Sequence, residues 1–557
     1  MKAEGLDDAS ISRENVLRRG AKCVKGLDAR RSNIYIAASI KELIKGSLGP
    51  EGRDKLIVNP KEGPALTSDG YIMLRRMKEL ADHPVVNILY EATFAMKNEY
   101  GDGKKSILIL AGELLKKAYT MIGKKIHPAI IVEGYSKAAS KALEALREMS
   151  EPLSTHDVDG LRSLAKTAMC GGLSDVEAER LAELAAHTIQ RLSFGSSKAS
   201  SLELDMVKLI SIPGGAVSDS ELVEGVVIKN DVLHQNMPRR VENAGIALMT
   251  MPLEMKKVTY THDGAKLEIL TPENWTQFLD EERKCMLGLV EALEKAGAKL
   301  VLTQWDIDNY VQYELAERGI MAAERVKEED LLLVAKATDA KLIKEQGAVS
   351  PEFIGFAGLV EEKRVQGTRP AERRWIFIRN CRNPRSATII VRGVVEERNK
   401  EVGRSLKNAL RVLKAFLEEG AIVGGAGSTE MELSFRLRSW ARGLPGKEQI
   451  AALAFADALE EIPAILAENL GLDPLETVMK LRAEHHAGKK WAGVDARKRT
   501  ICEDVLKEGI IEPYPLKAQV IKTAAEISTL LLRIDDQIYA SRSREARKPR
   551  EIPQDKR

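Results

Sequence analysis

The chain has 557 residues, of which 44% are hydrophobic and 30% are charged, and its formal net charge is +3. This length exceeds one hydrophobic core and predicts about three domains, while the ordinary soluble balance excludes a largely disordered chain. The small net charge indicates no nucleic-acid surface, and no apolar run approaches the roughly 18 residues of a membrane span. We therefore expect neither a nucleic-acid partner nor a membrane.

Cysteines and histidines are few and scattered. The five cysteines contain no CxxC pair, which favours a reducing compartment over a disulfide framework or a zinc site. The charged N-terminus lacks the apolar core of a signal peptide, so we expect a cytoplasmic protein. The one close histidine pair, His485-His486, is interpreted as surface because adjacent residues point apart on a helix.

The first 154 residues are predicted to be helical apart from one hairpin. After an arm over residues 1–20 that is expected to be mobile, apolar positions recur at helical spacing. Two short runs, 55–58 and 65–67, flank a turn with proline and glycine and predict the hairpin. The predicted helices cover residues 32–45, 87–97, 106–121 and 127–149.

Three glycine turns stand at the ends of these elements: residues 47–52, Asp69-Gly70 and Gly101-Asp-Gly103. Glycine allows close backbone approach, and the helix start after the third turn offers unpaired N–H groups and the positive dipole end. Asp102 could hold a metal ion while the amides of residues 103–106 face phosphate oxygens. Taken alone, each of these motifs is more often a plain turn, and Asp102 a solvated acid.

The pattern changes near residue 154. Short helices at 161–169 and 175–192 precede a strand at 206–212, and strands and helices alternate from about residue 222, which predicts an α/β region. Its strands are predicted at 246–250, 299–303, 319–322, 372–378 and 387–391, and its helices at 272–296, 307–317 and 328–338.

After Arg392 the helical pattern returns, and a charged tail over residues 541–557 is expected to be disordered. The order helical, mixed, α/β, mixed, helical suggests nested insertion, in which one domain interrupts a second that interrupts a third. Both helical ends would then form one domain and bring their glycine turns together. The last helices are predicted at 396–417, 429–441, 448–461, 464–470, 473–484 and 520–539.

Nine short motifs follow the order seen in group II chaperonins. One such motif is weak, but nine in collinear order make coincidence very improbable. The chain resembles a divergent member of this archaeal thermosome, or TCP-1-like, family over residues 14–540. The motifs are Ser47-Leu-Gly-Pro-Glu-Gly52, Thr67-Ser-Asp-Gly70, Gly101-Asp-Gly103, Ala111-Gly-Glu-Leu-Leu-Lys-Lys-Ala118, His127-Pro-Ala-Ile-Ile-Val-Glu-Gly-Tyr135, Asn236-Met-Pro-Arg-Arg-Val-Glu-Asn243, Ala454-Phe-Ala-Asp-Ala-Leu-Glu460, Gly509-Ile-Ile-Glu-Pro513 and Arg533-Ile-Asp-Asp536.

The resemblance implies a chaperonin fold, a multidomain α+β chain with an α/β apical part. A helical equatorial domain, a small intermediate domain and an apical substrate-binding domain with a helical protrusion are nested in one another. The implied boundaries are 1–154 and 409–540 for the equatorial domain, 155–223 and 386–408 for the intermediate domain, 224–385 for the apical domain and 541–557 for the tail.

The resemblance further implies a site for ATP and Mg²⁺ in the equatorial domain. Gly49 would contact phosphate with Gly70 nearby, Asp102 would hold Mg²⁺, and Asp69 would help to position the metal and the attacking water. The residues expected to cradle the phosphates are Gly103, Lys104, Lys105 and Ser106.

On the nucleoside side, the resemblance places Gly425 and Gly427 near the nucleoside, Asp495 near the base and Glu512 near the ribose. The helix that begins at Pro272 would belong to the apical protrusion, which serves as a built-in lid. Its side chains expected to contact the lid or the substrate, unless they simply pack on the α/β sheet, are Trp275, Phe278 and Leu279.

Two departures from the family pattern concern charge and proton transfer. Lys104 and Lys105 stand where the family has threonines, and they could neutralise phosphate charge, project away or block the pocket. Asn408 stands where the family has an aspartate that activates water. An amide cannot accept a proton as a carboxylate does, so this change should slow hydrolysis far more than binding.

Two further departures lie in loops of the same pocket. The loop that usually offers a lysine to sense the γ-phosphate is Met169-Cys-Gly-Gly172 here. Glu51 replaces a lysine, and Ala426 interrupts a triple glycine, where it restricts the backbone. Four changes around one pocket predict weak or absent ATP turnover, which leaves the enzymatic role open.

The sequence thus predicts an ATP-binding chaperone subunit that assists the folding of unfolded proteins in a homo- or hetero-oligomeric double ring, with slowed hydrolysis. The alternative is a non-hydrolysing structural or regulatory ring subunit, or a holdase. A small-molecule phosphotransferase would need a second substrate site, for which no motif is present.

Overall fold

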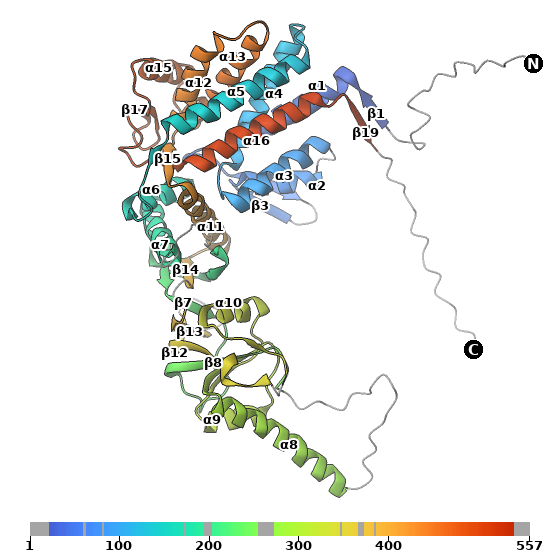
Figure 1. The fold of residues 1–557 in the computed structure, drawn as a ribbon, viewed down its shortest axis with the longest axis vertical. Coiled ribbons are helices and arrows are strands. Elements are labelled where there is room, and N and C mark those ends of the chain that lie inside the picture. Colours follow the sequence, from blue (N-terminus) through green and yellow to red (C-terminus); the bar gives the residue numbers. More distant parts are fainter. Residues whose placement is uncertain are drawn as a thin grey trace, which may run out of the picture.

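The computed structural model describes residues 22–59, 63–80, 83–171, 173–193, 203–253, 272–345, 348–365, 373–383 and 386–539. Along its long axis a helical body comes first, a small middle layer follows, and an α/β body lies at the far end (Figure 1). Across the described residues, no helix is long and apolar enough to cross a membrane.

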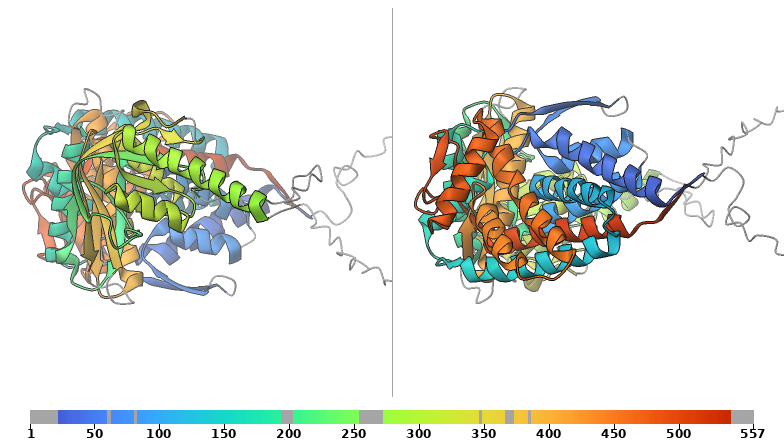
Figure 2. Two further views of the ribbon diagram at one scale, coloured as in Figure 1. Left: turned by 90° about the horizontal axis from the view of Figure 1, so that it is seen from below. Right: turned by 90° about the horizontal axis from the view of Figure 1, so that it is seen from above.

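The helical body combines both ends of the chain, whose helices lie side by side when it is seen from above (Figure 2, right). Its central helix is α4 (Lys104–Gly123), in which the run Ile107–Ala111 is fully buried. A helix that is apolar on all sides must be covered all round, and α4 packs on helices from both chain ends. The other helices of this body are α1 (Gly26–Lys45), α2 (Gly70–Leu80), α3 (Pro84–Glu99), α5 (Pro128–Met149), α12 (Ser428–Ala441), α13 (Glu448–Leu459), α14 (Glu461–Leu470), α15 (Pro474–His486) and α16 (Tyr514–Arg533).

The two ends of the described chain pair as strands. In an antiparallel ladder, β1 (Lys22–Lys25) runs beside β19 (Asp536–Tyr539). The prediction of one helix to residue 539 is therefore wrong, because α16 ends at Arg533. The chain turns there to reach β1, a partner more than 500 positions away that helical periodicity cannot reveal.

Short sheets bring the loops of the helical body together. The predicted hairpin is confirmed as β2 (Lys55–Asn59) and β3 (Gly63–Thr67). The remaining strands here are β15 (Ala421–Gly424) between β18 (Ile511–Pro513) and β4 (Glu151–Pro152), and the pair β16 (Gly493–Asp495) and β17 (Thr500–Cys502).

The middle layer joins two distant segments of the chain. Its helices are α6 (Val158–Ala168), α7 (Asp175–Ser193) and α11 (Glu396–Glu419). Its sheet places β14 (Ala387–Gly393) between the parallel β5 (Val207–Pro213) and the antiparallel β6 (Glu221–Val223). Short 3₁₀ turns lie at Leu204–Met206, Val217–Asp219 and, in the α/β body, Pro351–Phe353.

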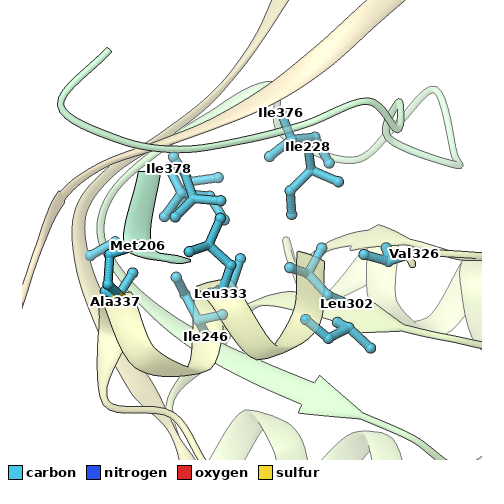
Figure 3. Close-up of a cluster of buried hydrophobic side chains, with 14 of the residues drawn as sticks. Met206, Ile228, Ile246, Leu302, Val326, Leu333, Ala337, Ile376 and Ile378 are labelled. Carbon is cyan, nitrogen blue, oxygen red and sulfur yellow. The ribbon is translucent and has the colours of Figure 1, made fainter. Parts of the chain in front are cut away.

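The α/β body is a mixed seven-stranded sheet in the order β10-β9-β8-β12-β13-β7, with β11 paired to β8. Helix α10 covers one face, where Leu333 and Ala337 lie near sheet residues such as Ile246 and Ile378 (Figure 3). Its elements are β7 (Gly225–Ile228), β8 (Arg240–Met249), α8 (Pro272–Lys295), β9 (Ala298–Thr303), α9 (Asn309–Glu317), β10 (Met321–Ala323), α10 (Glu328–Thr338), β11 (Leu342–Ile343), β12 (Gly355–Val365) and β13 (Arg373–Cys381).

A buried charge triad fastens α1, α4 and α14. Lys41 Nζ donates to Glu113 and to Glu461 Oε1, the latter at 2.5 Å, and the Lys41 side chain is only 1% exposed. Burial opposes the charge, yet hydrogen bonds and attraction from the two carboxylates raise the pKa of Lys41 above its usual value. Beside it, Gly112 allows the helices to approach, since a Cβ there would lie 2.7 Å from Lys41 Cβ.

We predict that Lys41→Ala lowers the free energy of unfolding by about 3–5 kcal/mol, because it leaves the buried Glu113 carboxylate with only its longer contacts to Lys116 and Lys117, both at 3.7 Å. Chemical denaturation of the purified protein measures this change. The control is Lys45→Ala on the same helix, whose exposed ion pairs contribute less than about 1 kcal/mol. Equal effects of the two variants would contradict a special role for the triad.

Candidate nucleotide site

A cavity of about 800 Å³ opens where the helical body meets the middle layer. Most of the predicted nucleotide residues line it, although they come from chain segments hundreds of positions apart. Gly425 lies just behind the lining, packed against Ile510 and Glu512. The predicted residues that line the cavity are Gly49, Asp69, Gly70, Asp102, Gly103, Lys104, Lys105, Ser106, Asn408, Gly427, Asp495 and Glu512.

Two long helices begin at the cavity wall. Gly103 caps α4 with a φ of +78°, and Gly427 caps α12 with a φ of +77°. A Cβ at Gly103 would lie 2.6 Å from Val520 Cγ2, and one at Gly427 2.7 Å from Pro463 Cβ, so both conformation and space require glycine. Neither cap supplies a side-chain acceptor to the first N–H groups. The start of α4 therefore offers unpaired donors and a positive dipole end to an anion, whereas at α12 the first N–H, that of Ser428, already donates to the Gly425 carbonyl oxygen.

Ala426 stands between the two glycines of the second cap loop with a φ of +54°. Residues with a Cβ seldom adopt this left-handed conformation. The loop keeps it because Val494 N donates to the Ala426 carbonyl oxygen and Gly425 N donates to Ile510. The substitution of alanine for glycine thus leaves the shape of this loop in place.

The Gly101-Asp-Gly103 turn rests directly on α11. A Cβ at Gly101 would lie 2.4 Å from the carbonyl oxygen of Asn408, so only glycine permits this contact. Asn408 is consequently held at the cavity next to Asp102, together with Glu401 and Ser405 of the same helix. This packing explains how a residue 300 positions away reaches the turn.

Asp69 is engaged by a lysine. Its Oδ1 caps α2 by accepting from the N–H groups of Tyr71 and Ile72, and its Oδ2 accepts from Lys104 Nζ at 2.5 Å. The side chains of Asp69 and Lys104 are 13% and 5% exposed. Burial favours the neutral acid, but the Lys104 ammonium and these donors hold the pKa of Asp69 below its usual value. Asp69 is therefore an ionised carboxylate with its own cation.

Lys105, the next residue of α4, has a different partner. Its Nζ donates to the Ser47 carbonyl oxygen at 2.6 Å, and its stem packs on Gly70. Burial lowers the pKa of Lys105, although Asp102 and Asp69 favour the charged form. Neither lysine projects away from the cavity, so that alternative from the sequence is wrong.

Asp102 is the carboxylate that remains available. It is partly exposed, and within the described residues it makes no hydrogen bond or ion pair. One such carboxylate fits Mg²⁺ that arrives with phosphate oxygens. Asp69 does not fit as a direct ligand because Lys104 already holds it. In keeping with this, the described part of the chain has no cluster of three or more metal-ligating side chains.

A second charge triad, not expected from the sequence, lies at the cavity, where Lys517 and Glu512 belong to the lining. Lys517 Nζ lies 2.5 Å from Glu430 Oε1 and 3.1 Å from Glu512 Oε2. Burial and the neighbouring acids Glu430 and Asp102 raise the pKa of Glu512 to about 7, against the attraction of Lys517. The sequence analysis missed Lys517 and Glu430, although each follows a glycine-turn motif within one or two helical turns. Asp495 is fully buried, and its Oδ2 has no hydrogen-bond partner among the described residues.

The middle layer contributes basic residues that were also missed. Lys166 and Arg162 of α6 line the cavity, and both pair with Glu179 of α7, at 2.5 Å and 3.0 Å. Lys166 is the main reason that the pKa of Glu179 is lowered. Cys170 and Gly171 of the predicted sensing loop also line the cavity, whereas Gly172 lies outside the described residues.

Of two further predictions, the surface position of His485 is wrong, and the role of the α8 side chains stays untested. His485 is buried rather than on the surface, because its ring bonds Glu432 at 2.8 Å and the Ala492 carbonyl oxygen at 3.0 Å, while His486 is exposed. The side chains of Trp275, Phe278 and Leu279 lie outside the described part of α8, so their predicted role stays a prediction.

These features define the class of the protein. A helical body made from both chain ends, a glycine-lined cavity where it meets the middle layer and a separate α/β body are together the build of a chaperonin subunit. The chain belongs to the TCP-1/cpn60 chaperonin family, whose family model matches residues 40–542. The predicted family membership is confirmed.

Similar proteins support the same assignment. Thermosome subunit beta and thermosome subunit alpha of Archaeoglobus fulgidus are each 39% identical to this chain, over 525 and 526 residues. The thermosome subunit of Pyrococcus horikoshii is 39% identical over 527 residues. These matches cover 94% or 95% of this chain and 94% of each relative.

The raised pKa of Glu512 predicts a pH dependence of stability. An unfolded glutamate loses its proton near pH 4.3 and the folded one at about 7, so the folded protein binds an extra proton between these values. The stability from this proton is present below about pH 4 and is lost as pH rises through 7. We expect the free energy of unfolding to fall by on the order of 2 kcal/mol from pH 5.5 to pH 8 through this group.

Denaturation of Glu512→Gln at both pH values measures the effect, because the amide cannot titrate. Its pH dependence should be flatter than that of the unmodified protein. Glu508→Gln, a change at a second cavity carboxylate without this burial, serves as the control and should leave the pH dependence in place. Identical pH profiles for all three proteins would refute the assignment.

Proposed function

We propose that this chain binds ATP with its triphosphate at the start of α4 and turns it over slowly. The observation that supports this most directly is the cavity itself, which the glycine-capped start of α4, Lys104 and Lys105 line together. Backbone N–H groups, dipole ends and ammonium groups together suit a polyanion such as a nucleotide triphosphate.

Family membership supplies the biological setting. A member of this chaperonin family is an ATP-dependent chaperone subunit of a double-ring assembly. We further propose that unfolded proteins are its clients, that the ring contains copies of this chain or related subunits, and that it works in the cytoplasm. Residues 1–154 and 409–540 would form the equatorial domain, 155–223 and 386–408 the intermediate domain and 224–385 the apical domain.

The same cavity supports roles for the individual residues. Gly49, Gly70 and the amides of residues 103–106 would face the phosphates, and Asp102 would hold Mg²⁺, which when bound offsets phosphate charge. At the other end, Gly425 and Gly427 would lie near the nucleoside, the free Oδ2 of Asp495 would accept from the base, and Glu512 would accept from the ribose.

Slow turnover would follow from two side chains. Asn408 occupies the α11 position beside the Gly101 turn, and its amide can orient water without accepting its proton. Asp69, a second polar group at the α4 start that could act on water, is neutralised by Lys104. A general base is typically worth about 10²–10⁴ in rate. Binding depends on neither group as a base.

A non-hydrolysing structural or regulatory subunit, or a holdase, is the alternative function, and family membership does not favour it. Single-turnover measurement of bound ATP separates the possibilities. Slow but complete conversion supports the proposal, whereas ATP that stays intact on the protein supports the alternative.

We predict that Asn408→Asp raises the rate of ATP hydrolysis by about 10²–10⁴ while the affinity for ATP changes little, because it restores a proton acceptor in an isosteric side chain. Phosphate release and equilibrium binding of ATP measure the two effects. Lys407→Asp places the same carboxylate on the exposed side of α11 and should leave the rate unchanged. A rate that is already brisk in the unmodified protein, or that does not respond to Asn408→Asp, would contradict the role of this position.

A further inference from the structure

The Lys104 ammonium lies at the cavity wall and pairs with a carboxylate. It lies 2.5 Å from Asp69 Oδ2, and both side chains are almost completely buried. Lys104 is also the first residue of α4, so its own backbone belongs to the helix start that faces the cavity. The cation is therefore fixed to the wall that receives the anion.

Among the described residues, the Lys104 ammonium has N–H donors that no second acceptor uses. An ammonium carries three N–H donors, and among the described residues Lys104 Nζ donates only to Asp69. Two donors remain for oxygens of an incoming anion. Lys105 Nζ likewise makes one bond among the described residues, to the Ser47 carbonyl oxygen, and has two donors left over.

A divalent ion at such a site would perform the same electrostatic task, since it would bridge a carboxylate and phosphate oxygens. Here the lysine already neutralises Asp69, and a second cation at that carboxylate would be repelled at short range and desolvated. Asp102 stays free for a metal, but a single carboxylate binds Mg²⁺ weakly unless phosphates supply further ligands. The triphosphate thus meets fixed positive charge before any metal is added.

We propose that Lys104 is a tethered cation that takes the place of a divalent metal ion between Asp69 and the phosphates, so that this chain binds ATP and ADP with little dependence on Mg²⁺. This inference rests on the proposed nucleotide site and assigns it a metal-independent binding mode. It also makes Lys104 a residue that determines affinity rather than one that blocks the pocket.

The test is equilibrium binding of ATP and of ADP to the full chain, by calorimetry, in excess MgCl₂ and in excess EDTA. The unmodified protein should show dissociation constants in the two conditions that differ by less than about tenfold. Lys104→Ala should weaken binding by about tenfold or more in EDTA, and added MgCl₂ should recover much of the loss. The control is Lys116→Ala on the exposed part of α4, which should behave like the unmodified protein.

Lys104→Ala leaves Asp69 buried without its cation, so this variant could fail to fold. The double variant Asp69→Asn with Lys104→Ala removes the cation without stranding a charge, and circular dichroism checks that it is folded. It should show the same loss of affinity in EDTA, because the missing element is the ammonium.

Each outcome separates the inference from the proposal on which it rests. Binding by the unmodified protein that requires Mg²⁺ would overturn the tethered cation and leave the nucleotide site standing. Metal-independent binding that survives in both Lys104 variants would also overturn it, since the charge would then come from elsewhere. Absence of binding in MgCl₂ and in EDTA would refute the nucleotide site itself, and the inference with it.

Discussion

The cavity depends on the close packing of one glycine turn between two long helices. Gly101 lies against the backbone of α11 at Asn408, and Gly103 lies against Leu516 and Val520 of α16. Any side chain at either glycine would push these helices apart. The turn therefore fixes the start of α4 relative to the middle layer and to the C-terminal helix at once. The other cavity residues are positioned around the point where the start of α4 meets α11 and α16.

Buried charge is the second constraint on this site. An isolated ammonium or carboxylate in such a place is costly, so each one needs a partner. Lys104 has Asp69, and Lys517 is shared by Glu430 and Glu512. Burial is the main reason that the pKa of Glu512 rises to about 7, and the neighbouring acids Glu430 and Asp102 add to the rise against the attraction of Lys517. The lysine at the start of α4 is thus compensated by one carboxylate, whereas the group around Lys517 retains a titrating acid.

Much of this arrangement could be predicted from the sequence, because it follows from local chemistry. Glycines at helix starts, the hairpin and the proline at the start of α15 were identified correctly. Long-range partners could not be identified in this way. Nothing near Asp536 indicates that it leaves α16 to pair with β1, and nothing in His485-His486 indicates that His485 is buried beside Glu432.

The lysines that follow the glycine turn show the same limit at the site. From the sequence, Lys104 could neutralise phosphate, project away or block the pocket. The residues next to it in the sequence are compatible with all three alternatives. The choice depends on Asp69, which precedes it by 35 positions and comes within 2.5 Å only through the packing of α2 on α4. Pairing patterns of this kind belong to the tertiary structure, so sequence periodicity does not contain them.

Nucleotide binding and hydrolysis would depend on different groups of one cavity. The departures from the family pattern affect these two sets of groups differently. Binding uses backbone N–H groups, left-handed glycines and fixed positive charge, and the two cap loops preserve these features even with Ala426 in place. Turnover needs a proton acceptor at one atom of one side chain. Asparagine and aspartate have the same size, so Asn408 can remove the acceptor while the contact with Gly101, which uses only its backbone, stays intact. The side chain at this position can therefore change without loss of the fold or the pocket, because the contact of Asn408 with the Gly101 turn is made by its backbone.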